Sequence, residues 1–249
     1  MKSTDVYKKV EDWYFKDVSN KLSSRTSREI DPIYNDKNAP LQIHCFGDSW
    51  TFGSGVEQEQ TFTHLLGHAM QTRDINTRKL SSVGVWNHGI RGAGFDTIAK
   101  KVSETYEQYD TTKSMYIITI PHLGRRVWFD DEGKLKTKKA WENEHKQGWL
   151  QYISGGSVGN EYNQYFYFFH QYMLLNRLIG KEKIIWGTWG IHPSAKSEIP
   201  ANLIDIYFDC VDLVSIDDSH PGGESHMNYA NKIAKVLGLK FDGVKNEIK

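Results

Sequence analysis

The chain has 249 residues, which is enough for one large domain or two small ones. Hydrophobic residues make up 39% of it and charged residues 25%, the proportions of a globular protein with a sizeable core. The 31 lysines and arginines balance the 31 aspartates and glutamates, so no net positive charge attracts nucleic acid or an anionic membrane. We therefore expect neither nucleic acid nor a membrane among its partners.

The sequence also predicts the cellular compartment in which the chain folds. Residues 1–15 are charged throughout and lack the apolar run of a secretory signal. No stretch approaches the roughly 18 consecutive apolar residues of a membrane span. Cys45 and Cys210 lie in apolar segments, which favours two small buried residues over a disulfide. We expect a soluble protein of a reducing compartment, cytoplasmic by default.

Residues 1–40 predict a helical extension that packs on the domain. Within residues 5–22, apolar side chains recur at close to helical spacing. They are Val6, Val10, Trp13, Tyr14, Val18 and Leu22. Residues 23–40 are polar, contain two prolines and predict an irregular segment that leads into the domain.

From residue 41 onward, short apolar runs alternate with segments of helical periodicity. This alternation is typical of a parallel sheet covered by helices on both faces. We therefore predict that residues 41–249 form a three-layer α/β/α sandwich, flavodoxin-like, with about five parallel strands. The expected strands are 41–46, 81–87, 114–120, 183–189 and a short one near 211–216, and the expected helices are 60–72, 94–109, 161–178 and 224–237. On the helix over 161–178 the expected buried face is Tyr165, Phe168, Phe169, Tyr172 and Leu175.

Residues 121–160 break the alternation. They are rich in Lys, Gly, Trp and His and predict an insertion over the surface, with a short hairpin around 131–133. Aromatic residues make up 13% of the whole chain. Such rings serve either core packing or an aromatic-lined groove for a ligand such as a sugar.

One segment, FGDSWTFGSGV (residues 46–56), follows the first expected strand directly. A nucleophilic serine needs a tight turn at the C-terminal end of a strand, with backbone N–H groups close to its hydroxyl. Gly47, Gly53 and Gly55 permit such a turn around Ser49. A glycine-rich turn without chemistry has the same local composition, so this segment alone leaves both interpretations open.

Three segments together resemble the sequence blocks of the SGNH (GDSL-like) hydrolase superfamily. GDSWTFGSGV resembles the first block, in which Gly-Asp-Ser holds the nucleophile. WNHGIRGAGFDT (residues 86–97) resembles the second block, an Asn-x-Gly-x-x-Gly segment, and DDSHPGGESHMNYANKIA (residues 217–234) resembles the C-terminal Asp-x-x-His-Pro block. The three come in the family's order along about 200 residues, which makes the resemblance specific.

The resemblance implies a catalytic triad and an oxyanion hole. Ser49 matches the nucleophile, His220 the general base and Asp217 the residue that orients the base. The backbone N–H groups of Ser49 and Gly92 match the donors to the oxyanion. The residue types suit this chemistry, because a serine hydroxyl needs a neighbouring base and an imidazole pKa near 6.5 fits that role. An aspartate three residues before a histidine can also reach the ring nitrogen that faces away from the serine.

Two positions depart from the family's pattern. The third block normally supplies an Asn after the third strand, but ITIPHLGRR (residues 118–126) contains none. His122 lies about where the Asn belongs, and its ring N–H could donate to the oxyanion; a surface histidine is the alternative. Asp218, next to Asp217, is the alternative orienting acid.

Other candidate groups carry weaker signals. The sequence has no HxH or HExxH spacing, no phosphate-binding loop and no dinucleotide fingerprint, so we expect no metal and no cofactor. His226 is expected to support the loop of His220 rather than to react. Arg125 and Arg126 could bind an anionic group, although surface arginines are usually solvated.

The sequence therefore predicts a serine hydrolase that acts on ester bonds. The aromatic insertion and the lack of a long apolar entrance favour a short acyl group, such as acetyl on a saccharide. The alternatives are a non-catalytic SGNH-fold module, for example in a viral or phage particle, and an acyltransferase. The oligomeric state stays open.

Overall fold

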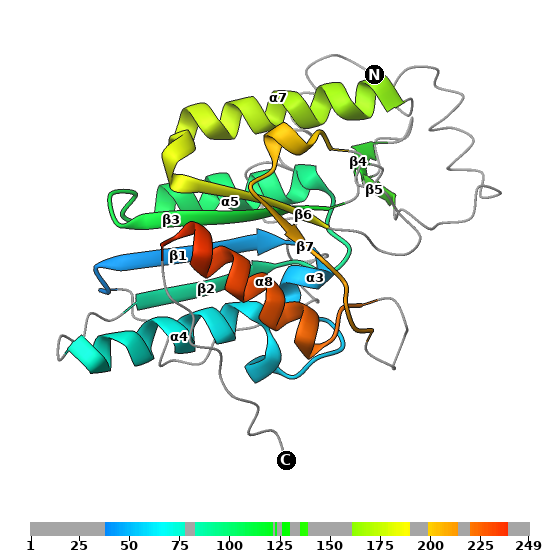
Figure 1. Cartoon of the computed structure of the whole chain (residues 1–249). Helices are drawn as coiled ribbons and strands as arrows, with labels where there is room; N and C mark the ends of the chain where they lie inside the picture. Colours follow the sequence, from blue (N-terminus) through cyan, green and yellow to red (C-terminus); the bar gives the residue numbers. More distant parts are fainter. Residues whose placement is uncertain are drawn as a thin grey trace.

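A five-stranded parallel sheet forms the centre of the protein, here in a computed structural model (Figure 1). The strand order is β2-β1-β3-β6-β7, which is the 2-1-3-4-5 order of flavodoxin-like folds. The predicted fold class is therefore confirmed. The strands are β1 (Leu41–Gly47), β2 (Val83–Gly89), β3 (Ser114–Ile120), β6 (Ile184–Trp189) and β7 (Ile206–Phe208). The structure describes residues 38–77, 83–121, 123, 126–129, 135–138, 161–189, 199–213 and 220–238.

Helices cover both faces of the sheet and make it the middle of three layers (Figure 1). Helices α4 (Phe62–Thr77) and α8 (Gly223–Val236) pack together on one face. Helices α5 (Phe95–Gln108) and α7 (Glu161–Ile179) pack together on the other. The remaining helical elements are short: α3 (Ser49–Phe52), η2 (Gln58–Gln60), η3 (Lys181–Lys183) and η4 (Ala201–Leu203).

The two faces of the sheet divide the core in two. Ile43 and Cys45 of β1 are fully buried in the cluster that includes residues of α4 and α8. Phe46 of the same strand belongs to the other cluster, with Ile118 of β3 and Phe168 of α7. Side chains of a strand point alternately to its two faces, so a strand covered on both sides is apolar along its whole length.

The last strand lies earlier in the chain than the sequence predicts. The expected strand near 211–216 is wrong: β7 spans Ile206–Phe208 and pairs with β6. Ile206 is 5% exposed and Phe208 is fully buried, whereas Val211 is 53% exposed. Residues 211–213 belong to the connection to α8, where Leu213 forms an isolated bridge with Pro221, and residues 214–216 lie outside the described residues.

The buried face of α7 is also narrower than predicted. Phe168, Tyr172 and Leu175 are buried, as expected. Phe169 is 42% exposed, because it lies one residue past Phe168 and points about 100° away from it around the helix. Of the two cysteines, Cys45 is fully buried and Cys210 is partly exposed, and both are free.

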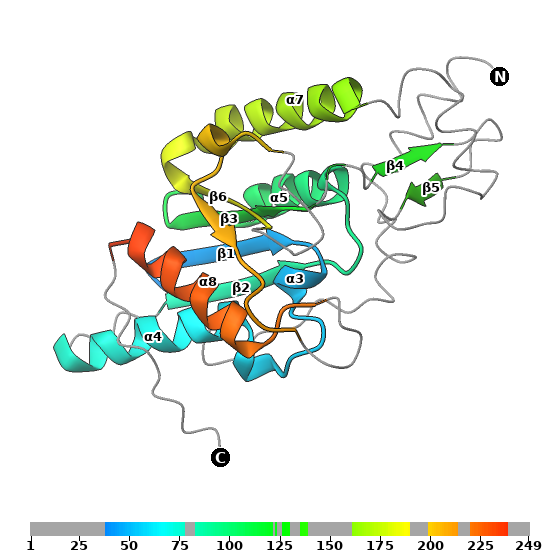
Figure 2. The ribbon, with the colours of Figure 1, turned by 45° about the vertical axis from the view of Figure 1, so that its right-hand side comes forward.

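The predicted hairpin in the region 121–160 forms from β4 (Arg126–Phe129) and β5 (Leu135–Lys138), which pair antiparallel. Figures 1 and 2 show it beyond the end of the sheet toward which the strand arrows point. The predicted helix over residues 5–22 lies outside the described residues. Among the helices that the structure describes, none is long and apolar enough to cross a membrane.

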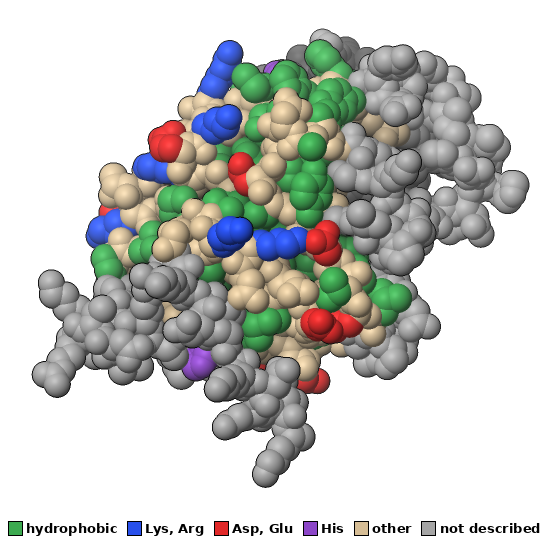
Figure 3. Space-filling model, in the orientation of Figure 1, with side chains coloured by type: hydrophobic (Ala, Val, Ile, Leu, Met, Phe, Trp, Pro, Cys, Tyr) green, Lys and Arg blue, Asp and Glu red, His purple; other side chains and the backbone are tan. Residues whose placement is uncertain are grey.

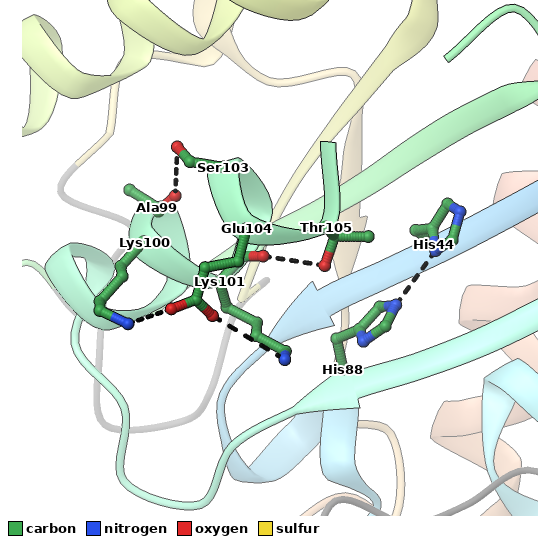
Figure 4. A network of polar contacts seen from close by, with 8 residues as sticks. All are labelled: His44, His88, Ala99, Lys100, Lys101, Ser103, Glu104 and Thr105. Atoms are coloured by element: carbon green, nitrogen blue, oxygen red, sulfur yellow. Dashed lines mark hydrogen bonds and ion pairs between the residues drawn. The ribbon is translucent and has the colours of Figure 1, made fainter. Parts of the chain in front are cut away.

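Two histidines are paired on the face of the sheet that α5 covers (Figure 4). Nδ1 of His44 on β1 lies 3.1 Å from Nε2 of His88 on β2. The rings of Tyr109, Tyr116 and Phe46 pack around His44, which is fully buried. Burial lowers the pKa of His44 to about 3. Burial, together with the neighbouring charges of His44 and Lys101, holds the pKa of His88 well below its usual range.

The histidine pair predicts a loss of stability in acid. The unfolded chain binds a proton at His44 near pH 6.5 and the folded chain only near pH 3, so the free energy of unfolding should fall as the pH falls between these values. A shift of this size corresponds to a loss on the order of 5 kcal/mol. Chemical denaturation of the wild type and of His44→Gln at several pH values measures it. The loss should be smaller in the variant; an equal loss in both would contradict the assignment.

Candidate active site

Ser49 lies in the turn that directly follows β1, at the C-terminal edge of the sheet. It is the first residue of the short helix α3, and Asp48 caps that helix by accepting a hydrogen bond from the Trp50 N–H at 3.1 Å. Gly53 ends the helix at φ +78°, in the left-handed region that glycine adopts without strain. The chain therefore turns sharply on both sides of Ser49, as a nucleophile turn requires.

The end of β2 lies directly against α3. A Cβ atom at Gly89 would meet the backbone N of Phe52 at 2.3 Å, so only glycine fits at this position. Asn87 joins the two elements through its side-chain amide. Its Nδ2 donates to the Thr51 carbonyl at 3.0 Å, and its Oδ1 accepts from the Gly89 N–H at 2.9 Å. The serine turn is thus held by β2 as well as by β1.

The loop after β2 carries Gly92. The Ile90 N–H donates to the Gly47 carbonyl at 3.0 Å, which fastens the loop to the residue two before Ser49. Gly92 has φ +72°, a conformation that L side chains rarely adopt. The residue between Ile90 and Gly92 in the sequence, Arg91, has its guanidinium 4.3 Å from the centre of the Phe52 ring of α3. The second sequence block and the serine turn are therefore in direct contact.

His220 lies three residues before α8, in a loop that Asp212 fastens to the start of this helix. The Asp212 carbonyl accepts from the Gly222 N–H at 2.9 Å. Its carboxylate accepts from the backbone N–H groups of Glu224 at 3.0 Å and Ser225 at 2.8 Å, and from the Ser225 hydroxyl. Burial raises the pKa of Asp212, but these hydrogen bonds outweigh it and leave the pKa below its usual value.

The start of α8 packs near the elements that follow the serine turn. His226 is fully buried, and its Nδ1 accepts a hydrogen bond from the Phe62 N–H at 3.2 Å. Because Phe62 begins α4 and follows η2, this bond fixes α8 against the chain that leaves the serine turn. His226 thus supports the neighbouring elements. Helix α8 begins three residues after His220, at the same edge of the sheet as α3 (Figures 1 and 2).

The structure describes three of the five predicted site residues. Ser49 is 5% exposed, Gly92 is mostly buried and His220 is partly exposed. Asp217, its alternative Asp218, and His122 lie outside the described residues. Arg125 does too, while Arg126 begins β4. Within the described part of the chain, no group of three or more His, Cys, Asp or Glu side chains is arranged to hold a metal ion.

Four residues that shape this region were given no role from the sequence. They are Asn87, Arg91, Asp212 and Trp189, whose ring stacks on Trp50 with ring centres 4.6 Å apart. Asn87 and Arg91 lie inside the second block, so their position was the available signal. Asp212 and Trp189 act through contacts across 13 or more residues, which no local pattern indicates.

Comparisons with known proteins give structural matches only. A scan against protein-family models and a search of the curated proteins both find no match. Among solved structures, the psychrotrophic esterase EstA from Pseudoalteromonas sp. is similar, with 12% identity, a TM-score of 0.48 and coverage of 79% of this chain and 96% of that one.

Two further structures are similar over about the same share of the chain. A protein from Desulfitobacterium hafniense DCB-2 that is assigned to the G-D-S-L family of lipolytic proteins has 15% identity and a TM-score of 0.42, covering 79% of this chain and 99% of that one. A family 3 carbohydrate esterase from Clostridium thermocellum has 12% identity and a TM-score of 0.44, covering 78% and 94%. At these scores the matches carry no function over to this chain.

The contact between Gly89 and α3 predicts the effect of adding one methyl group. Gly89→Ala should force β2 and α3 apart, lower the free energy of unfolding by about 1–3 kcal/mol and displace Ser49. Gly223→Ala is the matched control, because its Cβ would meet only the Gln60 side chain at 3.4 Å, an ordinary contact. Denaturation curves of the two variants measure the difference. Equal stability of both would contradict the close approach.

Proposed function

We propose that the protein is a serine esterase that hydrolyses a short acyl ester through Ser49. The observation that carries the proposal is the contact between two loops at the C-terminal edge of the sheet. One loop holds Ser49, and the other holds Gly92 in a positive-φ conformation and is hydrogen bonded to Gly47. In open α/β sheets, this edge, where the strand order reverses between β1 and β3, is where ligands bind.

The proposed reaction has two steps. The Ser49 hydroxyl attacks the ester carbonyl while His220 takes its proton, and His220 then returns the proton to the alcohol that leaves. Water, deprotonated by His220, next attacks the acyl-enzyme and releases the acid and free Ser49. In both steps the backbone N–H groups of Ser49 and Gly92 would donate to the tetrahedral oxyanion. Asp217 would hold the His220 ring in the required tautomer.

The proposed substrate carries a short acyl group, such as acetyl, on a saccharide. The bulky side chains of the serine turn are packed against neighbouring residues. Trp50 is 2% exposed and stacks on Trp189 at the end of β6, and Phe52 lies under Arg91. Such packing supports a small acyl site rather than a long apolar tunnel. Aromatic rings near the edge of a site also suit the flat apolar faces of sugars.

Replacing the nucleophile tests the mechanism. Ser49→Ala should lower the turnover of p-nitrophenyl acetate by on the order of a million-fold and leave the fold intact. Ser54→Ala is the matched control, since Ser54 is a buried serine of the same turn and should be dispensable. Initial rates of the two purified variants, with circular dichroism as the check on folding, give the answer. Activity retained in Ser49→Ala would exclude the mechanism.

The length of the acyl chain tests the substrate class. Because Trp50, the residue after Ser49, is buried and stacked on Trp189 rather than lining an open tunnel, acetyl esters should be hydrolysed with a higher kcat/KM than octanoyl esters of the same alcohol. A series of p-nitrophenyl esters from two to twelve carbons measures this preference. A maximum at the long chains would instead indicate a lipase or thioesterase.

The third donor to the oxyanion is the point at which the chain departs from the family that it resembles. If His122 supplies this donor, His122→Ala should lower kcat by about a hundred- to a thousand-fold with little change in KM, because the bond forms mainly in the transition state. His122→Asn should recover part of that loss. Full activity of His122→Ala would mean that two backbone donors suffice.

The same departure favours a second candidate function, a non-catalytic module. The chain has ITIPHLGRR after β3, with no Asn for the third block. A folded wild-type protein that hydrolyses none of the test esters, and that His122→Asn does not activate, would favour this second function.

A further inference from the structure

Helix α7 is apolar on two opposite sides. One side packs into the core through Phe168, Tyr172, Leu175 and Ile179. The other side is exposed and still carries large hydrophobic residues. They are Phe166 (65% exposed), Tyr167 (41%), Phe169 (42%), Met173 (37%), Leu174 (51%) and Leu178 (44%), which we call the outer face of α7.

This concentration is confined to one element. Of the nine large hydrophobic residues that are exposed among the described residues, six belong to the outer face of α7. In Figure 3 hydrophobic side chains gather at the top of the molecule, over the position of α7 in Figure 1. Single exposed apolar residues are ordinary on a protein surface, but a contiguous group along one helix marks a surface that another segment covers.

The chain itself contains a segment of suitable pattern. Residues 5–22 carry apolar side chains at helical spacing, from Val6 through Trp13 to Leu22, with charged residues between them. A helix of these 18 residues would be about 27 Å long, and the 19 residues of α7 make a helix of about 28 Å. The two would match along their whole lengths.

The chain between residues 5–22 and β1 is long enough for this segment to reach α7. Helix α7 ends at Ile179 and is followed through η3 by the start of β6, so its C-terminal end lies at the edge of the sheet where β1 starts. β1 and β6 are separated by β3 alone, which makes them about 10 Å apart. Residues 23–37 can span up to about 50 Å, more than the strand spacing and the thickness of the helix layer together.

We infer that residues 5–22 form an amphipathic helix of the same chain that docks on the outer face of α7. The apolar side, with Trp13 near its middle, packs against Phe166, Met173 and Leu174. The docked segment adds a fourth layer over α7, and its C-terminal end lies nearest the edge where β1 starts. The inference is independent of the chemistry at Ser49.

Hydrogen–deuterium exchange of the full chain tests this docking. The backbone amides of residues 5–22 should exchange at least tenfold more slowly than in the isolated peptide of the same sequence. Leu174→Asp should bring their exchange to the rate of the peptide, while the amides of β1 and β3 stay protected. Val236→Asp is the matched control, since Val236 is 50% exposed on α8 and the docking does not involve it.

A second pair of variants tests the docking from the side of residues 5–22. Trp13→Asp should raise the rate of Met173 oxidation by peroxide several-fold, because it uncovers the outer face of α7. Ser19→Asp is its control, since it adds the same charge on the polar side of the segment. If Leu174→Asp fails to fold, this pair still tests whether residues 5–22 cover the outer face of α7.

Three results would overturn the inference. One is exchange of residues 5–22 at the peptide rate in the wild type. Another is protection of these residues that Leu174→Asp leaves unchanged, together with unchanged Met173 oxidation in Trp13→Asp. The last is a dimer, seen by sedimentation, that Leu174→Asp converts to monomers without altering the exchange of residues 5–22, because a second copy would then cover α7.

Discussion

The close approach of β2 to α3 is the constraint on which the proposed site depends. Gly89 has no side chain, and the backbone of Phe52 occupies the place where a Cβ atom would lie. The Asn87 side chain then joins the buried backbone groups of Thr51 and Gly89 by hydrogen bonds, and its Nδ2 also donates to the buried Thr63 hydroxyl. Because buried polar groups are costly to leave unpaired, this arrangement resists any change in the position of the serine turn. Ser49 is held by the sheet rather than by a mobile loop.

Other contacts bring distant segments to the same edge of the sheet. The Gly47 carbonyl accepts from the Ile90 N–H, so the loop with Gly92 follows the end of β2 to the residue just before the serine turn. On the other side, His226 accepts from the Phe62 N–H and Asp212 caps α8, which brings the segment with His220 to the same edge. A parallel sheet ends all its strands at one edge, and each of these contacts adds a loop to that edge.

The sequence predicted the parallel sheet and the serine turn well, for a physical reason. A strand buried on both faces must be apolar throughout, and LQIHCF and SMYIITI show this directly. The strand after residue 205 was misplaced because β7 has only three residues, fewer than the apolar run that follows it. The outer face of α7 was also missed, since periodicity shows that a helix is apolar but not which of two apolar sides faces the core. Asp212 acts on Ser225 across 13 residues, a contact that only the fold creates.

A fluorophosphonate probe tests whether Ser49 is an activated nucleophile. Such a probe forms a stable adduct only with a serine whose proton is removed by a neighbouring base. Intact mass should show one adduct per chain, peptide mapping should place it on Ser49, and ester hydrolysis should be lost in proportion to labelling. A folded protein that takes up no probe, or that is labelled at another serine while Ser49 stays unmodified, would contradict the account.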